Sequence, residues 1–498
     1  MWTQKLSKPR YHSNCHFTTD RTDSPQPQPQ PQPQALTISP KSFVRFLSLS
    51  LTEPRHCIAM GAEIPGILKL KCSVKRYVWG KVGKDSRVGR LYANNSGEEI
   101  KGDEPYAEFW MGTHESGPSY AVVPVEENGG LPNGGLQRKD GPKRNYCELV
   151  SLKDWIRRNP HVLGDKVLKK WGPDLPFLFK VLSVAKVLSI QAHPDKDLAA
   201  ILHKRHPGVY KDDNHKPEMA LALTEFEALC GFVGLEEFKS VVRNVPEITE
   251  VVGTASAHQA LNISEQDGEK KLKEVLRSLF TKLMSTSKAI ISEVVLKLIS
   301  RLNITRKVRQ LTDKEELVLR LEKQFPGDVG VIAAFLLNYV KLSTGEALYV
   351  AANEPHAYIH GECVECMATS DNVVRAGLTP KTLDVQTLCS MLTYKQGFPE
   401  ILHGVPSNPY TVKYSPPFDE FEVDRCILPQ AKSTVFPAVP GPSVFLVISG
   451  EAVMRLPFSE ELVTEGDVIF TPANTAITVE TTSGLNLYRA GVNGKFFE

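Results

Sequence analysis

The chain has 498 residues, 41% of them hydrophobic and 23% charged, an ordinary globular composition in a chain too long for a single core. The formal net charge of +2 gives no reason to expect nucleic acid or an acidic membrane surface as a partner. The nine cysteines are scattered and odd in number, unlike a disulfide framework, and no apolar run approaches the about 18 residues of a membrane span.

The N-terminal segment has a composition unlike the rest of the chain. Pro and Gln alternate from Pro25 to Gln34, and proline cannot join a sheet ladder or a helix interior. The flanking sequence contains Ser, Thr and Arg with few acids, which is compatible with an organelle transit peptide in residues 1–59. The alternative is a dispensable leader that ends before Met60. We predict a disordered leader over residues 1–62, and we favour a cytoplasmic protein.

Strand-like segments dominate both ends of the remaining chain. Short apolar runs separated by Gly, Asn and Ser predict strands between Ile67 and Val125, and a second β-rich run extends from Phe177 to Gln191. Strand patterns return at Ala347 and continue to the C-terminus. The last hundred or so residues have the pattern of a separate β unit.

The middle of the chain has a helical pattern. Apolar residues recur at helical spacing between Leu235 and Phe325. Thr312 followed by Glu315 is a capping-box pattern that opens one of these helices. The apolar run from Val331 to Val340 predicts a further, buried helix. A helical block between β-rich segments indicates an insertion into a β domain.

A weak internal repeat relates residues 345–356 to residues 466–477. Both segments begin with Gly and an acid, continue with a short apolar strand, and place an Asn before the next strand. Jelly-roll barrels of the cupin type use this layout. Ile477 stands where the first copy has His356, so one barrel could bind a metal and the other could not.

Four polar residues form a candidate metal site. Gln191 and His193 have the i, i+2 spacing that points both side chains to one face of a strand. Glu218 and His356 would complete a set of two imidazoles, one carboxylate and one amide oxygen. Zinc is the commonest metal for a non-redox site of this kind. The other histidines near this region are interpreted as surface or satisfied core residues: His203, His206 and His215.

Several longer segments occur in the same order as the signatures of a known family. They are Tyr-Ala-Glu-Phe-Trp-Met-Gly-Thr-His (106–114), Gln-Ala-His-Pro-Asp-Lys (191–196), His-Lys-Pro-Glu-Met-Ala (215–220), Pro-His-Ala-Tyr (355–358) and the run 362–381 that begins Glu-Cys-Val-Glu-Cys-Met. With these segments, residues 67–498 resemble the type I phosphomannose isomerases. Cys363 and Cys366 belong to this signature, so we interpret the pair as strand packing and not as a redox site.

The resemblance implies a mainly β fold with a helical insertion, in which two cupin-type jelly-roll domains accompany an α-helical domain. The expected division is a catalytic cupin domain in two parts (63–234 and 331–400), a helical domain (235–330) and a C-terminal cupin-like domain (401–498). A monomer with one zinc ion per chain is expected. The resemblance places zinc on four residues: Gln191, His193, Glu218 and His356.

The resemblance also implies the activity and the residues that line the pocket. The family interconverts mannose 6-phosphate and fructose 6-phosphate. Expected catalytic residues are Arg375, Glu365 and Lys216. Expected substrate-binding residues are Ser189, Lys180, Tyr358, Asp371 and Lys381.

The reaction moves a hydrogen between C2 and C1 of the sugar, which a metal ion and a positioned base can promote. Glu365 is the candidate base, although a hydride shift is the alternative. Lys216 or Asp371 would shuttle protons or open the ring, and Arg375 would serve the oxyanion, the phosphate or both.

Two other functions compete with this interpretation. One is a non-catalytic cupin that binds a sugar phosphate, and the other is a related isomerase that acts on a different sugar phosphate. The presence of both Arg375 and Glu365 argues against the first, because a protein that only binds the sugar phosphate need not retain both. The helical insertion and the signature around Arg375 argue against the second.

Overall fold

The computed structural model describes residues 66–125, 146–457 and 459–498. All of these residues belong to one compact unit. The predicted leader over residues 1–62 lies outside the described residues. Within the described ranges, no helix combines the length and the apolar character that a membrane span requires.

The first large sheet carries the predicted metal ligands. In its described part the strand order is β16 (Ile401–Leu402), β13 (Ala347–Val350), β10 (Glu218–Ala222), β14 (His356–Ala368), β8 (Phe177–Val184), β5 (Glu108–Met111) and β2 (Ser73–Lys75). The other strands that pair with it are β11 (Phe226–Phe232), β12 (Leu337–Leu342), β9 (Ile190–Ala192) and β15 (Val374–Gly377). Alternate side chains of these strands enclose one apolar cluster that includes Leu182, Ala220 and Cys363, which makes this sheet the first barrel.

The second large sheet is built mainly from the C-terminal part of the chain. In its described part the strand order is β17 (Val405–Asn408), β18 (Thr411–Tyr414), β19 (Glu422–Leu428), β25 (Leu485–Gly491), β21 (Ser443–Arg455), β23 (Val468–Thr471), β1 (Leu68–Lys71), β6 (Tyr120–Val125) and β7 (Tyr146–Ser151). Also paired with it are β20 (Lys432–Phe436), β22 (Glu460–Thr464) and β24 (Ile477–Thr481). Its inner face forms a separate apolar cluster around Phe445, Ile469 and Ile477, the core of the second barrel.

Strand pairing crosses the predicted domain division. Leu70 on β1 lies opposite Val468 on β23 and Ala121 on β6, so the segment 63–234 contributes strands to both barrels. A third apolar cluster, which includes Phe179 and Phe470, is shared between the two barrels. The predicted domain boundaries remain a prediction. They do not coincide with the two sheets, because β1 pairs with β23 far along the chain, and no short turn marks such a pairing in the sequence.

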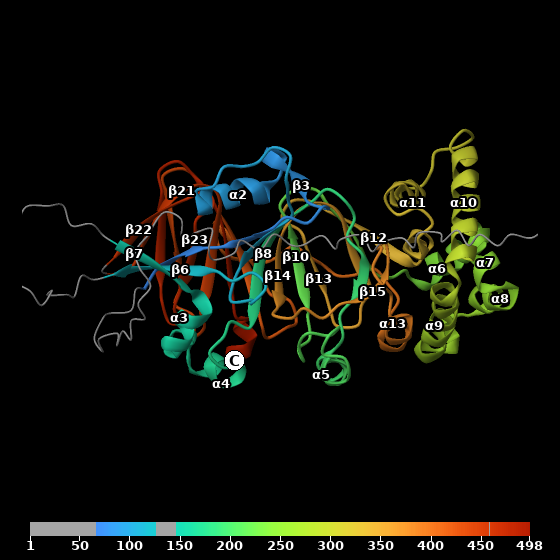
Figure 1. The fold of residues 1–498 in the computed structure, drawn as a ribbon, viewed down its shortest axis with the longest axis horizontal. Coiled ribbons are helices and arrows are strands. Elements are labelled where there is room, and N and C mark those ends of the chain that lie inside the picture. Colours follow the sequence, from blue (N-terminus) through green and yellow to red (C-terminus); the bar gives the residue numbers. More distant parts are fainter. Residues whose placement is uncertain (1–65, 126–145, 458) are drawn as a thin grey trace, which may run out of the picture. The chain divides into compact units, whose positions relative to one another are not determined.

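The helices of the insertion gather beside the first barrel, next to β12 and β15 (Figure 1). They are α6 (Leu235–Asn244), α7 (Pro246–Val252), α8 (Thr254–Asn262), α9 (Glu269–Ser285), α10 (Lys288–Thr305) and α11 (Asp313–Gln324). Their apolar stripes meet in one core that includes Leu276, Phe280 and Leu298. The predicted capping box is confirmed: the Glu315 amide donates to Thr312 Oγ1 at 3.2 Å, and the Thr312 amide donates to Glu315 Oε2 at 2.8 Å.

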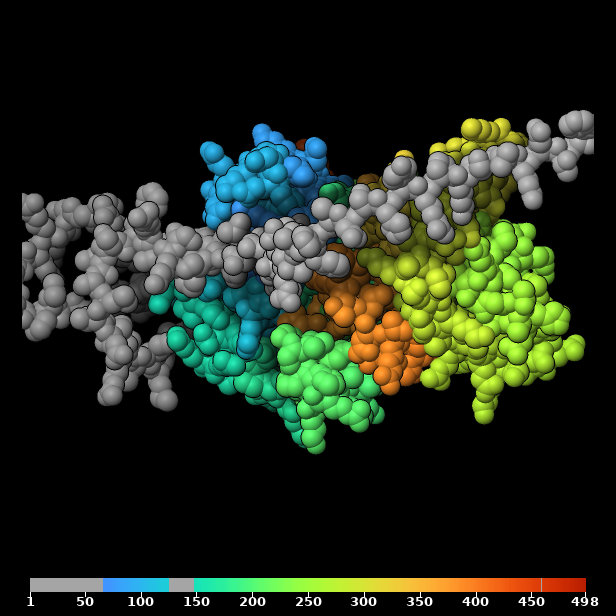
Figure 2. Space-filling model, turned by 45° about the vertical axis from the view of Figure 1, so that its right-hand side comes forward, coloured from blue at the N-terminus to red at the C-terminus, as the bar shows by residue number. Residues whose placement is uncertain are grey.

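Shorter helices cover the barrels. They are α2 (Arg87–Ser96), α3 (Leu152–Arg158), α4 (Asp165–Trp171), α5 (Lys196–Arg205) and α13 (Val385–Met391). Figure 2 shows the orange surface that includes α13 between the green surface of α5 and the yellow-green helices of the insertion. A hydrogen bond from Tyr210 Oη to Asp384 Oδ2, 2.9 Å long, joins the segment after α5 to the start of α13.

The predicted helix over Val331–Val340 is only half right. α12 (Val329–Ala333) and a 3-10 turn end at Leu336, and the chain then continues as strand β12, where Leu342 lies opposite Phe226. A short apolar run is compatible with either structure. Pairing with β11, which the local sequence does not encode, makes the second half a strand.

The internal repeat is present in the backbone. Gly345 and Gly466 have φ of 92° and 90°, and Asn353 and Asn474 have φ of 62° and 60°. β14 begins at His356 and β24 begins at the equivalent Ile477. Gly, and less often Asn, occupy this left-handed region at low cost. Both barrels therefore use the same pair of turns at the same spacing.

Candidate metal centre and active site

Three of the four predicted metal ligands meet inside the first barrel. Ligand atoms of His193, Glu218 and His356 all lie within 4.8 Å of one another. His193 Nε2 is 3.3 Å from Glu218 Oε1, and His356 Nε2 is 3.4 Å from Glu218 Oε2. Each side chain is at most 2% exposed. Glu218 and His356 are the first residues of β10 and β14, and His193 follows the end of β9.

The two imidazoles are oriented as metal ligands are. His193 Nδ1 lies 2.7 Å from the carbonyl oxygen of Asn372, and His356 Nδ1 lies 3.1 Å from that of Glu354. Both Nε2 atoms are buried and have no hydrogen-bond partner among the described residues. Unpaired buried polar atoms are uncommon, and a carbonyl on Nδ1 fixes the tautomer that offers Nε2 to a metal. Two free imidazole nitrogens beside a carboxylate fit a divalent cation.

The charge states of these residues agree with that assignment. Burial lowers the pKa of His193 to about 4, so its ring is neutral at pH 7. Burial would raise the pKa of Glu218, but Lys216 and then His193 lower it well below the usual value, so the carboxylate is ionised. Neutral imidazole and ionised carboxylate are the forms that bind metal.

Gln191 lies beside this cluster. It is opposite His356 in the register of β9 with β14 and opposite Arg375 in that of β9 with β15. Its Oε1 accepts a hydrogen bond from Ser189 Oγ at 3.4 Å. We expected Gln191 and His193 on one strand, but β9 ends at Ala192. His193 reaches the site from the first residue after the strand.

A buried ion pair lies deeper in the same barrel. Lys180 Nζ is 2.6 Å from Glu365 Oε2 and 3.6 Å from Glu108 Oε2. Lys180 on β8 and Glu365 on β14 are direct partners in the register. Trp110 Nε1 donates to Glu108 Oε2 at 2.6 Å. Sequence reasoning missed Glu108 and Trp110, although both lie in the quoted segment 106–114 with the alternation of an inward-facing pair.

Two further predicted residues contact Glu218. Lys216 Nζ is 3.0 Å from Glu218 Oε1, and Tyr358 Oη donates to Glu218 Oε2 at 3.4 Å. Both side chains are buried. They therefore connect the metal ligands to the inner wall of the barrel.

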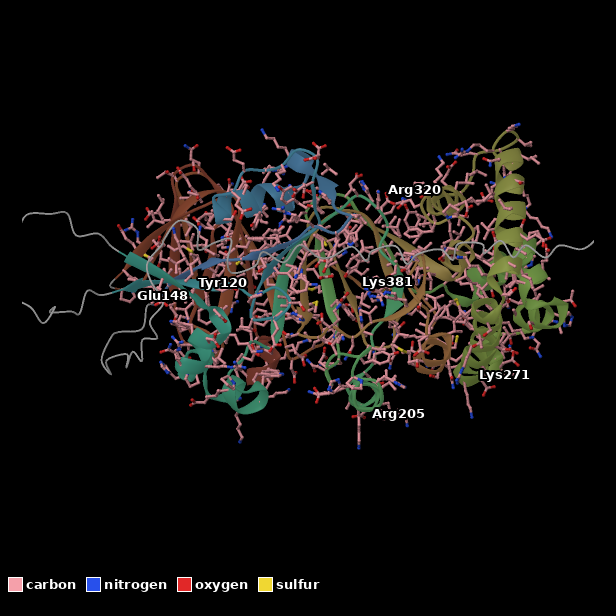
Figure 3. The ribbon with its side chains drawn as sticks, viewed as in Figure 1. Tyr120, Glu148, Arg205, Lys271, Arg320 and Lys381 are labelled. Carbon is pink, nitrogen blue, oxygen red and sulfur yellow. The ribbon has the colours of Figure 1, made fainter. Side chains whose placement is uncertain are left out.

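The remaining predicted residues lie toward solvent. Asp371 Oδ1 is 3.3 Å from His114 Nε2, and a hydrogen bond from His114 lowers the pKa of Asp371. Arg375 on β15 is partly buried, and among the described residues its guanidinium makes no hydrogen bond or ion pair. Burial lowers the pKa of Arg375, and burial followed by the Arg375 charge lowers that of Lys381. Figure 3 shows Lys381 next to β15.

The cysteine pair and the neighbouring histidines behave as expected. Cys363 faces the core of the first barrel and Cys366 faces the cluster shared by the two barrels, and both thiols are free. A spacing of three places residues on opposite faces of a strand. His203 Nδ1 lies 2.8 Å from the Tyr210 carbonyl, and His215 Nε2 lies 2.8 Å from Glu420 Oε1.

Family models match both parts of this architecture. Residues 67–235 match the catalytic domain of the type I phosphomannose isomerases, and residues 248–337 match the helical insertion domain of the same family. This chain belongs to the type I phosphomannose isomerase family. The predicted resemblance is thereby confirmed.

Curated relatives in the family span nearly the same length. Mannose-6-phosphate isomerase 1 of Arabidopsis thaliana is 59% identical over 86% of this chain and 94% of its own. The mannose-6-phosphate isomerase of Homo sapiens is 38% identical over 85% of this chain and 97% of its own.

Solved structures of phosphomannose isomerases share the fold. The mannose 6-phosphate isomerase of Salmonella typhimurium, bound to its substrate and to zinc, is 28% identical with a TM-score of 0.69, over 86% of this chain and 100% of that one. The fold class that we predicted, two cupin-type barrels with a helical domain, is confirmed.

Proposed function

We propose that this chain is a zinc-dependent isomerase that interconverts D-mannose 6-phosphate and D-fructose 6-phosphate. The observation that carries the proposal is the buried His193–Glu218–His356 cluster with both Nε2 atoms unpartnered. The names of the curated relatives and the substrate and metal of the Salmonella typhimurium structure support the same choice.

The proposed zinc ligands are Gln191, His193, Glu218 and His356, and one ion per chain is expected. When bound, zinc supplies a Lewis acid that polarises a sugar oxygen and stabilises negative charge on it. The second barrel offers no comparable set in its described part: Ile477 stands at the position of His356 and lies in an apolar cluster.

Glu365 is the proposed base. Lys180 holds one oxygen of its carboxylate, so the group has a defined position on the inner wall of the barrel. Burial raises the pKa of Glu365, against the attraction of Lys180, and a base is most effective when its pKa is near the working pH. The carboxylate takes the proton from one carbon of the substrate and returns it to the other.

The other polar residues have proposed roles in binding and proton transfer. Lys216 and Asp371 shuttle protons between hydroxyls or assist ring opening. Arg375 and Lys381 present positive charge to the phosphate or to the developing oxyanion, since neither has an acidic partner among the described residues. Ser189 and Tyr358 line the pocket.

This activity would supply mannose 6-phosphate for GDP-mannose and glycan synthesis. We further propose a cytoplasmic location and a monomer. The scattered, odd-numbered cysteines favour a reducing compartment, and the monomer is an expectation that size-exclusion chromatography with light scattering would test.

The test is an isomerase assay on the full chain before and after treatment with a chelator. We expect turnover of mannose 6-phosphate that is lost with the metal, restored by zinc, and accompanied by one zinc per chain. His356→Gln should lose both zinc and turnover, whereas His403→Gln, at a side chain that is 72% exposed, should keep both. A folded, zinc-loaded protein that binds the sugar phosphate without turnover would establish the non-catalytic alternative instead.

A further inference from the structure

The two segments that carry the histidine ligands are joined by a pair of polar side chains. Asn353 Nδ2 donates to Asp195 Oδ2 at 2.7 Å, and the Asp195 amide donates to Asn353 Oδ1 at 3.2 Å. The Asn353 amide also donates to the carbonyl of His193 at 2.7 Å. Asp195 lies two residues after His193, and Asn353 lies three residues before His356. The pair therefore connects the two ligand-bearing turns directly.

Both members of the pair are themselves held in place. Asp195 Oδ1 accepts a hydrogen bond from the Leu198 amide at 2.9 Å and caps helix α5. The carbonyl of Asn353 accepts one from the Thr393 amide at 3.2 Å. Each carboxylate oxygen of Asp195 thus has a separate partner, and the pair is tied to helix α5 and to the segment that follows α13.

We propose that Asp195 and Asn353 are positioning residues that set the separation of His193 and His356 for metal binding. The inference rests on the proposed function, because it concerns the affinity of the proposed zinc site. Ligands that are held at the correct distance before binding lose less entropy when the metal arrives. Residues that orient metal ligands without touching the ion typically contribute about 10-fold to 100-fold in affinity.

The second barrel shows which features of Asn353 belong to the turn alone and which belong to the metal site. Asn474 has the same left-handed conformation as Asn353, and its amide donates to the Val439 carbonyl at 2.7 Å, as the Asn353 amide does to His193. The side chain of Asn474 is exposed and makes no hydrogen bond among the described residues. The turn alone accounts for an asparagine in both barrels, but of these two asparagines, among the described residues, Asn353 is linked to a carboxylate and Asn474 is not.

The first experiment compares Asn353→Gly with Asn474→Gly in the full chain. Glycine accepts the positive φ of both turns, so each variant keeps its turn and loses only the amide side chain. Competition with a chromophoric chelator measures zinc affinity. We expect Asn353→Gly to bind zinc about 10-fold to 100-fold more weakly and Asn474→Gly to match the unmodified chain. Equal affinity in all three proteins overturns the inference.

The second experiment exchanges the pair. Asn353→Asp alone places two carboxylates against each other, and Asp195→Asn alone places two amides together, so each should weaken zinc binding. In the double variant Asp195→Asn with Asn353→Asp, the new amide at position 195 donates to the new carboxylate at position 353, so the hydrogen bond between the side chains is restored with donor and acceptor exchanged. The cap of α5 is kept as well, because asparagine also caps helices. Its zinc affinity and the visible spectrum of its cobalt form should return toward those of the unmodified chain. A double variant as weak as the worse single one overturns the inference.

The two proposals fail in different ways. An unmodified chain that holds no zinc overturns the proposed metal site and this inference with it. Tight zinc binding by the unmodified chain, with no loss in Asn353→Gly and no rescue in the exchanged pair, overturns only the inference.

Discussion

Lys180 Nζ lies 2.6 Å from Glu365 Oε2 inside the first barrel, and these side chains are 7% and 4% exposed. The two residues face each other across β8 and β14. Burial lowers the pKa of Lys180, but Glu365 and then Glu108 outweigh it and raise the pKa above its usual value. A permanently charged lysine therefore stands against the proposed base and fixes one of its oxygens.

Replacing that base should separate catalysis from metal binding. We expect Glu365→Gln to lower turnover of mannose 6-phosphate by about 100-fold to 10,000-fold, the range of one general base, with zinc content unchanged. Steady-state kinetics and metal analysis check this. Glu362→Gln is a matched control, because Glu362 lies on the same strand and is equally buried. Its Oε2 pairs with Arg87 Nε at a distance of 3.2 Å, and this pair is not part of the proposed site. Normal turnover in Glu365→Gln would remove Glu365 from this role.

Arg375 is the strongest candidate for electrostatic stabilisation. It lies opposite Gln191 in the sheet and has no ion-pair partner among the described residues. Arg375→Ala should lower turnover about 100-fold or more, as loss of one positioned donor often does. Arg320→Ala is the control, since Arg320 is exposed on α11 (Figure 3) and pairs with Glu227 on β11, away from the site. Comparable kinetics for the two variants would contradict the role of Arg375.

The stability of the metal-free protein should depend on His193. Its pKa is about 4 in the folded chain and about 6.5 in an unfolded one. Between these values the unfolded chain binds more protons, so the free energy of unfolding falls as the pH decreases from 6.5 toward 4. Above pH 6.5 this contribution is fully present. Urea unfolding of chelated protein at pH 7 and pH 5 should show a smaller decrease for His193→Gln than for the unmodified chain or His403→Gln.

The capping box at the start of α11 should stabilise the fold without affecting zinc binding. Thr312→Ala removes the acceptor for the Glu315 amide and should lower the free energy of unfolding by about 1 kcal/mol. Thr312→Ser keeps the hydroxyl and should have little effect. Zinc affinity should be the same in both, because Thr312 is in the helical insertion and the metal ligands are in the barrel. Chemical unfolding and chelator competition measure the two quantities, and altered zinc affinity in Thr312→Ala would show coupling between insertion and site.

Features that depend on local chemistry could be predicted from the sequence. The repeat was visible because Gly345 and Gly466, and likewise Asn353 and Asn474, adopt positive φ that few other residues accept. The capping box was visible because Thr312 and Glu315 are near neighbours in the chain. The ligand set was proposed from side-chain chemistry and from the resemblance, and the structure brings His193, Glu218 and His356 together.

Features that depend on strand pairing were decided only by the tertiary structure. β1 pairs with β23, which lies near the other end of the chain. The run after Leu336 becomes a strand because β11 lies beside it. Glu108 joins Lys180 and Glu365 from a third strand. The same holds for the link between Asp195 and Asn353. The sequence alone determines which turns, caps and ligand types are available. Which of them meet depends on which distant strands pair, and no short turn joins those strands to fix their pairing locally.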